Sequence, residues 1–425
     1  MPRSPSTALG TALATALLFG TLPASAQRVI DLQGADRALP GTPADVWAVG
    51  TATGRDWEQL NGVAAMTFDA RDHLYVVDAG NFRVLQFDAA GRFVRQFGSQ
   101  GGGPGEFNLP RGVAVTTDGA VVVADMMGGY EVFDSAGAFV RAVPYPDDMR
   151  SVQRLAAHPR EGVVASSMAA PVLRPGGDMS ALRQPIPVRV FQQPVRADAQ
   201  LAVLHEHNDP PPQVETSSAG GQRVMMRVGP GRDMFTPAFS WGVLPDGRVA
   251  TLNGAAYAIR INDARGAHAA TLRRPLEPRP VTERIQRQAR AVERARLEGG
   301  EAGAGGVSVT VQNGVTSFGS GGGAPELTPQ QIDERVAALT FAAVVPAARR
   351  MITDPQGRIW VERYAADFSE PGPVDLLTMD GRYLGTLRDT PLPAAVSASG
   401  LAAWLDRDEL GVERVVVRRL PTGWR

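Results

Sequence analysis

Four arginines stand at comparable places in the chain, just before the first apolar run in a recurring unit of short runs. A guanidinium group binds carboxylate and phosphate groups through paired hydrogen bonds. If the units surround a common axis, these side chains would form a positive ring suited to a carboxylate, a phosphate or an anionic sugar. The alternative is that they face bulk solvent or pair with neighbouring acids. The four are Arg111, Arg154, Arg349 and Arg350.

A second group of side chains could bind a metal ion. His205-Glu206-His207 is the only cluster among the five histidines, and Asn208 and Asp209 could add oxygen ligands. On a strand, alternate residues share one face, so both imidazoles would point the same way. The alternative is an exposed polar strand end. The chain has no cysteine, which excludes thiolate ligands and a thiol nucleophile.

An internal repeat shows which elements must position these side chains. Residues 66–78 (MTFDARDHLYVVD) align with residues 113–125 (VAVTTDGAVVVAD) at an offset of 125 − 78 = 47. Residues 87–95 align with residues 133–141 at an offset of 133 − 87 = 46. Each copy holds four short apolar runs separated by Asp, Gly and Asn, the residues of hairpin turns. A period in the forties with four strand-like runs predicts the blade of a β-propeller.

The rest of the chain supplies further blades, and we expect six in all. Weaker copies begin near residues 155, 242 and 352. The last blade has only three strand-like runs, so we expect the lone run at residues 45–50 to supply its fourth strand and close the ring. Aspartates recur in the turns, where we expect them to fix turn geometry rather than act as acids. They are Asp69, Asp118, Asp246 and Asp354.

An insertion is expected between blades four and five, at residues 275–345. Apolar residues at helical spacing predict one helix near residues 281–295, and Thr328 is placed to cap a second helix. Between them lies a Gly-rich segment whose Asn313-Gly314 pair indicates a hairpin. A lone two-stranded hairpin is marginal in water, so the alternative is a segment without stable structure.

The first 26 residues have the features of a secretory signal peptide. An apolar run is followed by Ala24-Ser25-Ala26 before Gln27, and the run is short for a membrane anchor, which is the alternative. No later run is long enough to span a membrane, so residues 27–425 should form an exported propeller in the periplasm or outside the cell. The formal net charge of −1 gives no strong field for nucleic acid.

The motif Asp78-Ala79-Gly80-Asn81-Phe82-Arg83-Val84 resembles the D-x-G-N-x-R-V core of NHL repeats, although Phe82 replaces the histidine. Residues 29–420 are similar to secreted bacterial six-bladed β-propellers of the NHL type. This resemblance implies an all-β fold and export. It leaves activity open, because such proteins include binding modules, sensor domains and a few lyases and hydrolases. Related propeller enzymes hold Ca²⁺, Mg²⁺ or Zn²⁺ on the axis, yet no histidine recurs here at matching blade positions.

Two functional hypotheses follow. The first is an exported, monomeric, non-catalytic propeller without a cofactor that binds a small anionic ligand or a protein partner through its channel face and loops. Under it, the four arginines bind the ligand and no residue is catalytic. The second is a metal-dependent lyase or hydrolase, with Ca²⁺ or Zn²⁺ held at His205 and His207.

Overall fold

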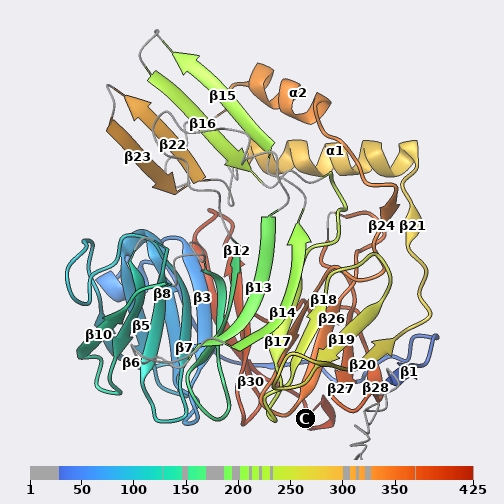
Figure 1. The fold of residues 1–425 in the computed structure, drawn as a ribbon, viewed down its shortest axis with the longest axis horizontal. Helices are drawn as coiled ribbons and strands as arrows, with labels where there is room; N and C mark the ends of the chain where they lie inside the picture. Colours follow the sequence, from blue (N-terminus) through green and yellow to red (C-terminus); the bar gives the residue numbers. More distant parts are fainter. Residues whose placement is uncertain are drawn as a thin grey trace, which may run out of the picture.

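The chain is a six-bladed β-propeller with an insertion above one face (Figure 1). The structure is a computed structural model and describes residues 28–126, 128–145, 152–168, 186–193, 202–209, 213–219, 223–229, 233–299, 307–312, 315–320, 327–368 and 370–424. The expected signal peptide lies outside the described residues. Within them, no helix combines the length and the apolar character that a membrane crossing requires.

The first three blades are antiparallel sheets whose strands follow one another along the chain. Blade one holds β3 (Val63–Phe68), β4 (Leu74–Asp78), β5 (Arg83–Phe87) and β6 (Phe93–Phe97). Blade two holds β7 (Pro110–Val115), β8 (Val121–Asp125), β9 (Gly129–Phe133) and β10 (Phe139–Val143). Blade three holds β11 (Val152–Ala157), β12 (Val163–Met168), β13 (Ile186–Gln193) and β14 (Ala202–Asp209).

The other three blades complete the ring. Blade four holds β17 (Ser240–Val243), β18 (Val249–Leu252), β19 (Ala258–Asn262) and β20 (His268–Arg273). Blade five holds β25 (Arg350–Thr353), β26 (Arg358–Glu362), β27 (Val374–Thr378) and β28 (Tyr383–Leu387). Blade six holds β29 (Ala395–Val396), β30 (Leu401–Arg407), β31 (Glu413–Arg419) and, from the start of the chain, β2 (Ala44–Val49). The predicted all-β, six-bladed fold is confirmed.

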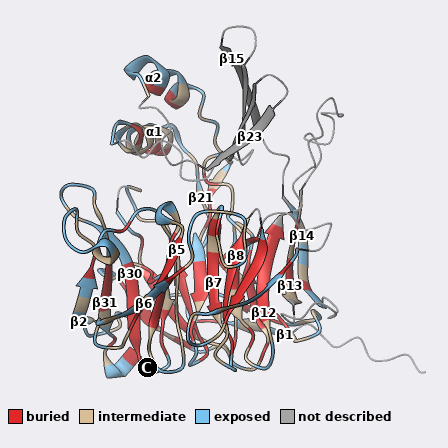
Figure 2. Ribbon diagram, turned by 90° about the vertical axis from the view of Figure 1, so that its left-hand side faces the viewer, coloured by how far each residue is buried: buried red, intermediate tan, exposed pale blue. Residues whose placement is uncertain are grey.

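The core lies between the blades. Every residue of β4, β5, β8 and β9 is buried, because each middle strand packs on both sheet faces against a neighbouring blade. Figure 2 shows this buried band running through the propeller. The aspartates of the turns act as predicted. Oδ1 of Asp69 accepts hydrogen bonds from the amides of Arg71 and His73, both at 2.8 Å. Oδ1 of Asp354 likewise accepts hydrogen bonds from the amides of Gln356 and Arg358, both at 3.0 Å.

The NHL-like motif holds the chain that enters blade one. The carboxylate of Asp78 accepts hydrogen bonds from Nδ2 of Asn81 and Nε of Arg83, both at 2.8 Å. Arg83 also donates to the main-chain carbonyls of Asp56, at 2.8 Å, and Gln59, at 3.0 Å. Asp78 is fully buried and Arg83 is 5% exposed. The motif residues are therefore structural in this blade.

Closure occurs as the sequence predicts. β2 pairs antiparallel with β31, from Ala44 opposite Arg419 to Val49 opposite Val415. Trp47 adds an apolar contact with blade one, since its ring lies 5.5 Å from that of Phe87. The last blade is thus built from both ends of the propeller sequence.

The N-terminal segment does more than the predicted closure. β1 (Arg28–Asp31) pairs in parallel with β20, as a fifth strand on blade four. Ala38 then bridges to Thr386 on β28 of blade five, and β2 completes blade six. Residues 28–49, which we call the N-terminal belt, therefore cross the outer edges of three successive blades. Nothing in the sequence analysis anticipated the first two attachments.

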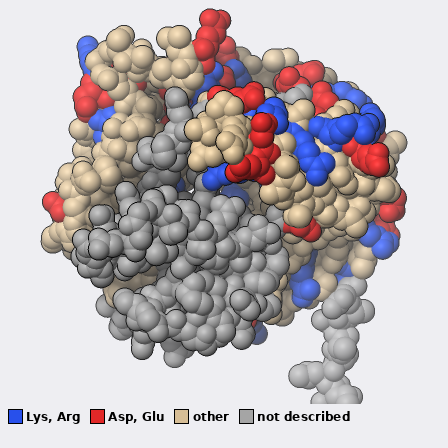
Figure 3. Space-filling model, turned by 90° about the horizontal axis from the view of Figure 1, so that it is seen from above, with Lys and Arg blue, Asp and Glu red and all other residues tan. Residues whose placement is uncertain are grey.

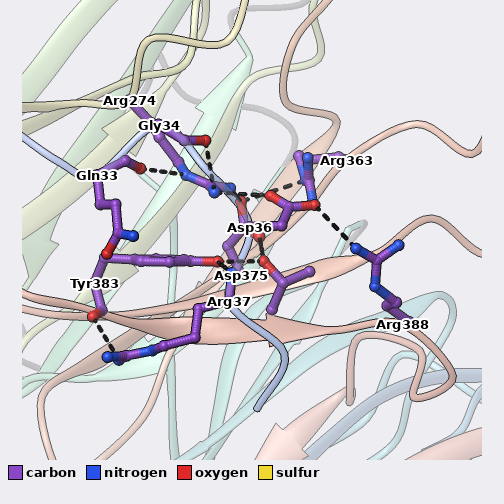
Figure 4. A network of polar contacts seen from close by, with 10 residues as sticks. Gln33, Gly34, Asp36, Arg37, Arg274, Arg363, Asp375, Tyr383 and Arg388 are labelled. Atoms are coloured by element: carbon purple, nitrogen blue, oxygen red, sulfur yellow. Dashed lines mark hydrogen bonds and ion pairs between the residues drawn. The ribbon is translucent and has the colours of Figure 1, made fainter.

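A buried arginine fastens the belt between blades four and five (Figure 4). The side chain of Arg274 is fully buried, and its guanidinium group contacts Asp375 at 2.7 Å and Asp36 of the belt at 2.8 Å. Nε of Arg274 donates to the carbonyl of Gln33 at 2.9 Å, and the group lies 4.3 Å from the ring of Tyr383. Burial by itself would raise the pKa of Asp36, but hydrogen bonds from Arg363 and Arg274 outweigh it and lower that pKa.

The insertion contains two helices and a small sheet above the propeller (Figure 1), and Figure 2 shows the two helices from another side. α1 (Glu283–Glu298) is capped by Thr282 and α2 (Pro329–Ala337) by Thr328, the predicted cap. β21 (Arg279–Pro280) and β24 (Val344–Val345) pair at its base. The Gly-rich segment forms the hairpin of β22 (Val307–Gln312) and β23 (Val315–Ser320).

This hairpin is not the isolated one considered in the sequence analysis. β22 pairs with β16 (Arg223–Gly229), which pairs with β15 (Gln213–Ala219). The chain between blades three and four thus contributes half of a four-stranded sheet. The pairing of β16 with a segment some eighty residues later in the chain was not predicted from the sequence.

We expect a disulfide across the closing ladder to stabilise the ring. Asp45 and Arg418 are opposite residues on β2 and β31, joined by an ion pair of 2.7 Å. Because the chain has no cysteine, Asp45→Cys with Arg418→Cys creates a single possible bond. Oxidation should raise the free energy of unfolding by up to ~5 kcal/mol, as expected when a long loop is closed. The comparison is between oxidised and reduced protein in urea unfolding. Failure of the thiols to couple would contradict the register.

We expect removal of Asp375 to be costly because it leaves Arg274 buried with weaker compensation. Asp375→Ala should lower the free energy of unfolding by about 3 kcal/mol or more. Asp31→Ala is the matched control, since Asp31 pairs with the neighbouring Arg273 at 2.7 Å but both side chains are more than half exposed. Its cost should stay below ~1 kcal/mol. Equal costs in thermal or urea unfolding would show that the network in Figure 4 does not hold the belt.

Candidate anion site at the channel mouth

The inner strand of each blade begins at the end of the propeller that carries the insertion. Phe235 and Val345, five residues before β17 and β25, pack with Ile285 and Ala289 of α1. The chain therefore descends from the insertion directly into the inner strands of blades four and five. Side chains at these strand starts lie at the mouth of the central channel, beneath the insertion.

Arg154 links three blades at this mouth. It belongs to β11 of blade three, and its guanidinium group lies 5.5 Å from the ring of Trp241 on β17 of blade four. Its Nη1 donates at 3.4 Å to the main-chain carbonyl of Met351 on β25 of blade five. The side chain of Arg154 therefore connects blade three with the inner strands of blades four and five.

The charge of Arg154 has no acidic partner. None of the ion pairs formed by the described residues includes its guanidinium group, and its single hydrogen bond is to a neutral carbonyl. Burial, together with the nearby charge of Arg350, lowers the pKa of Arg154 to about 10. The group stays charged at neutral pH while its environment disfavours the charge.

Arg349 and Arg350 lie on the blade-five side of the mouth and share one carboxylate. Nε of Arg350 is 2.5 Å from Oε2 of Glu362, and Nη1 of Arg349 is 3.6 Å from Oε1. Glu362 is 1% exposed, whereas the side chains of Arg349 and Arg350 are 47% and 52% exposed. The carboxylate thus lies beneath two outward-facing guanidinium groups.

Arg111 begins the inner strand of blade two but is not shown in contact with the other three. It follows Pro110 at an irregularity of β7, and burial lowers its pKa. Its Nε is buried without a hydrogen-bond partner among the described residues. The structure therefore brings Arg154, Arg349 and Arg350 together and leaves Arg111 as a separate cation on the same end of the propeller.

Three contributors to this site were not predicted from the sequence: Glu362, Trp241 and Ser240. Oγ of Ser240 accepts from the amide of Met351 at 2.9 Å and donates to its carbonyl at 2.8 Å, which fixes the group that Arg154 contacts. Glu362 could have been found from the repeat, because it ends the second strand of its blade just as Asp78 and Asp125 do. Trp241 carries no such signal.

The two histidines considered as candidate metal ligands under the second hypothesis pack against an aromatic ring. His205 and His207 lie on the same face of β14, as predicted, with ring centroids 5.4 Å apart. The ring of Phe239 is stacked on His205 at 5.4 Å and lies 4.3 Å from that of His207. Burial lowers the pKa of His205 to about 4. Over the part of the chain that is described, no three His, Asp or Glu side chains converge as metal ligands would.

An aromatic seam joins the insertion to blade five beside Arg349. The ring of Phe235 lies 4.9 Å from that of Phe368 and 5.6 Å from that of Tyr364. Arg349 in turn lies over the ring of Tyr364 at 5.7 Å. Phe235 and Phe368 both have left-handed backbone conformations, with φ of 69° and 67°. Such conformations cost free energy in non-glycine residues and are retained where packing requires them.

The face that bears the insertion has no uniform charge. Seen from above, acidic and basic side chains alternate over the part that is described (Figure 3). Arginines of α1 are largely paired: Arg294 contacts Asp333 at 2.6 Å and Arg296 contacts Glu293 at 2.7 Å. The outer surface of the insertion is therefore a poor candidate for anion binding compared with the channel mouth.

Comparisons with known proteins support the fold only. A family model described as a 6-bladed beta-propeller matches residues 61–148, which cover blades one and two. No curated protein matches the chain. Among solved structures, it is similar to the calcium-binding protein regucalcin from Agrobacterium tumefaciens strain C58, with 12% identity, a TM-score of 0.37, and coverage of 92% of this chain and 97% of that one.

Two further solved structures are similar to this chain at a comparable level of sequence identity and TM-score. A gluconolactonase from Xanthomonas campestris shares 12% identity at a TM-score of 0.36, with 91% of this chain and 99% of that one covered. A luciferin-regenerating enzyme shares 11% identity at a TM-score of 0.41, with 86% and 93% covered. Similarities this distant give no ground for assigning those proteins' activities or ligands to this chain.

Proposed function

We propose that this chain is an exported β-propeller that binds a small anionic ligand at the mouth of its central channel. The observation that carries the proposal is Arg154, a cation held between three blades with no carboxylate beside it. Arg350 and Arg349 complete the site from blade five, and Arg111 adds positive potential from blade two. No chemical step is assigned to these residues.

The physical reason is the cost of a partly buried charge that has no carboxylate partner. Removing a guanidinium group from water is unfavourable unless an opposite charge or full hydrogen bonding compensates for it. Arg154 receives only one long hydrogen bond and the face of an indole ring. An anion in the channel would supply the missing charge, and a planar guanidinium group is suited to bind carboxylate or phosphate oxygens.

Export is the second element of the proposal. It rests on the apolar run and the Ala24-Ser25-Ala26 sequence before Gln27. We expect the chain expressed in a Gram-negative host to be recovered from the periplasm with Gln27 as its first residue, as N-terminal peptide mass spectrometry would show. Recovery of the uncleaved chain from the cytoplasm would contradict export and would leave the anion site unaffected.

We expect anions to stabilise the protein through Arg154. In thermal unfolding at constant ionic strength, a bound anion at one hundred times its dissociation constant should add about 2.7 kcal/mol to the free energy of unfolding. Arg154→Met removes the charge and keeps an unbranched apolar side chain, so most of this gain should disappear. Arg92→Gln is the control, because Arg92 is 82% exposed in a turn of blade one. An identical anion response in wild type and Arg154→Met would overturn the proposal.

A further inference from the structure

We infer that the ligand of the channel mouth carries two negative charges, and that Glu362 sets this preference. The inference rests on the proposed function and specifies the class of ligand. The occupants it selects are dianions such as a dicarboxylate or a sulfate or phosphate group, in preference to a monoanion of the same shape.

The charge count comes from the groups that the structure places together. Arg154 contacts the carbonyl of Met351, the residue that follows Arg350, while Arg350 and Arg349 both contact Glu362. Three cations against one carboxylate leave two positive charges. Arg111 is left out of the count because no contact joins it to this group. In a partly desolvated site, the ligand that binds best carries a charge equal and opposite to the net charge of the site. Any charge left uncompensated, of either sign, would still be unfavourable because it has been removed from water.

The position of Glu362 explains why the ligand need not displace it. Its carboxylate is 1% exposed, beneath the two arginines, so it is not in competition with a ligand that arrives from the channel. Arg350 uses Nε to reach Glu362, and no described residue accepts a hydrogen bond from its two terminal nitrogens. Those donors are left for the ligand. Glu362 therefore acts as a positioning residue that also fixes the net charge of the site.

The fold keeps these groups in place by contacts that do not involve a ligand. Ser240 fixes the Met351 backbone from blade four, and the amide of Arg349 donates to the main-chain carbonyl of Glu362 at 2.7 Å. Arg349 also lies over Tyr364, a member of the seam with the insertion. The cations are thus held before binding, which reduces the entropy lost when a ligand is bound.

The test compares anions of matched shape that differ in charge. Isothermal titration of the wild-type protein at constant ionic strength uses succinate against succinamate, its monoamide, and sulfate against perchlorate, a tetrahedral monoanion. We expect each dianion to bind about tenfold more tightly than its monoanionic counterpart, the effect of one additional charge-assisted hydrogen bond. Preference for succinate alone, or for sulfate alone, would support the inference and report whether the two charges are separate or on one group.

Variants then change the charge of the site by one unit in each direction. Arg350→Gln leaves one positive charge and should reduce the preference for succinate over succinamate to about twofold or less. Glu362→Gln keeps the hydrogen-bonding shape, leaves three positive charges and should tighten the binding of both anions. Arg92→Gln, remote from the site, should reproduce the wild-type ratio.

The outcomes separate this inference from the proposed function. Binding without a preference for the dianion in either pair, measured on the wild-type protein, would overturn the dianion inference and leave the anion site standing. Absence of binding for all four anions would overturn the proposed function and the inference with it. Neither result depends on whether the variant at the buried Glu362 folds, because both come from the wild-type protein.

Discussion

The structure depends on the closure of its ring by backbone pairing. A propeller buries its sheets against one another, so a blade with a missing neighbour exposes an apolar face and an unpaired strand edge. Here the gap is filled by β2, whose ladder with β31 joins the two ends of the propeller. With no disulfide available, this ladder and the N-terminal belt hold the ring. The belt pairs with the outer strands of three blades, and the buried Arg274 binds it where blades four and five meet.

Closure also determines the geometry of the candidate site. Arg154 belongs to blade three and its hydrogen-bond acceptor to blade five, so their contact exists only if the intervening blade keeps both at a fixed separation. Trp241 and Ser240 of blade four occupy that intervening place and touch both neighbours. The geometry of the candidate site therefore depends on the closure of the ring.

The sequence was informative where local chemistry repeats and silent where contacts cross between distant segments. The Asp-Gly turns and the alternating apolar runs made the blades, their number and the closing strand predictable. The sheet of β15, β16, β22 and β23 was not, because pairing between segments some eighty residues apart leaves no local pattern. The arginines were found because they precede the apolar runs of the inner strands. The carboxylate of Glu362, which Arg349 and Arg350 share, was not predicted. Trp241 could not be predicted, since an aromatic residue on an inner strand is equally suited to a blade core.

The site arises where a repeated position changes its role. Asp78 and Asp125 end the second strands of blades one and two, and each accepts hydrogen bonds from the amides of the segment that enters its blade. Glu362 stands at the same position in blade five, opposite the first residue of the inner strand. Its longer side chain contacts Arg349 and Arg350. Its main-chain carbonyl, rather than its carboxylate, accepts the hydrogen bond from the amide of the entering segment, here the amide of Arg349. One added methylene and two arginines thus convert a structural acid into the base of a charged pocket.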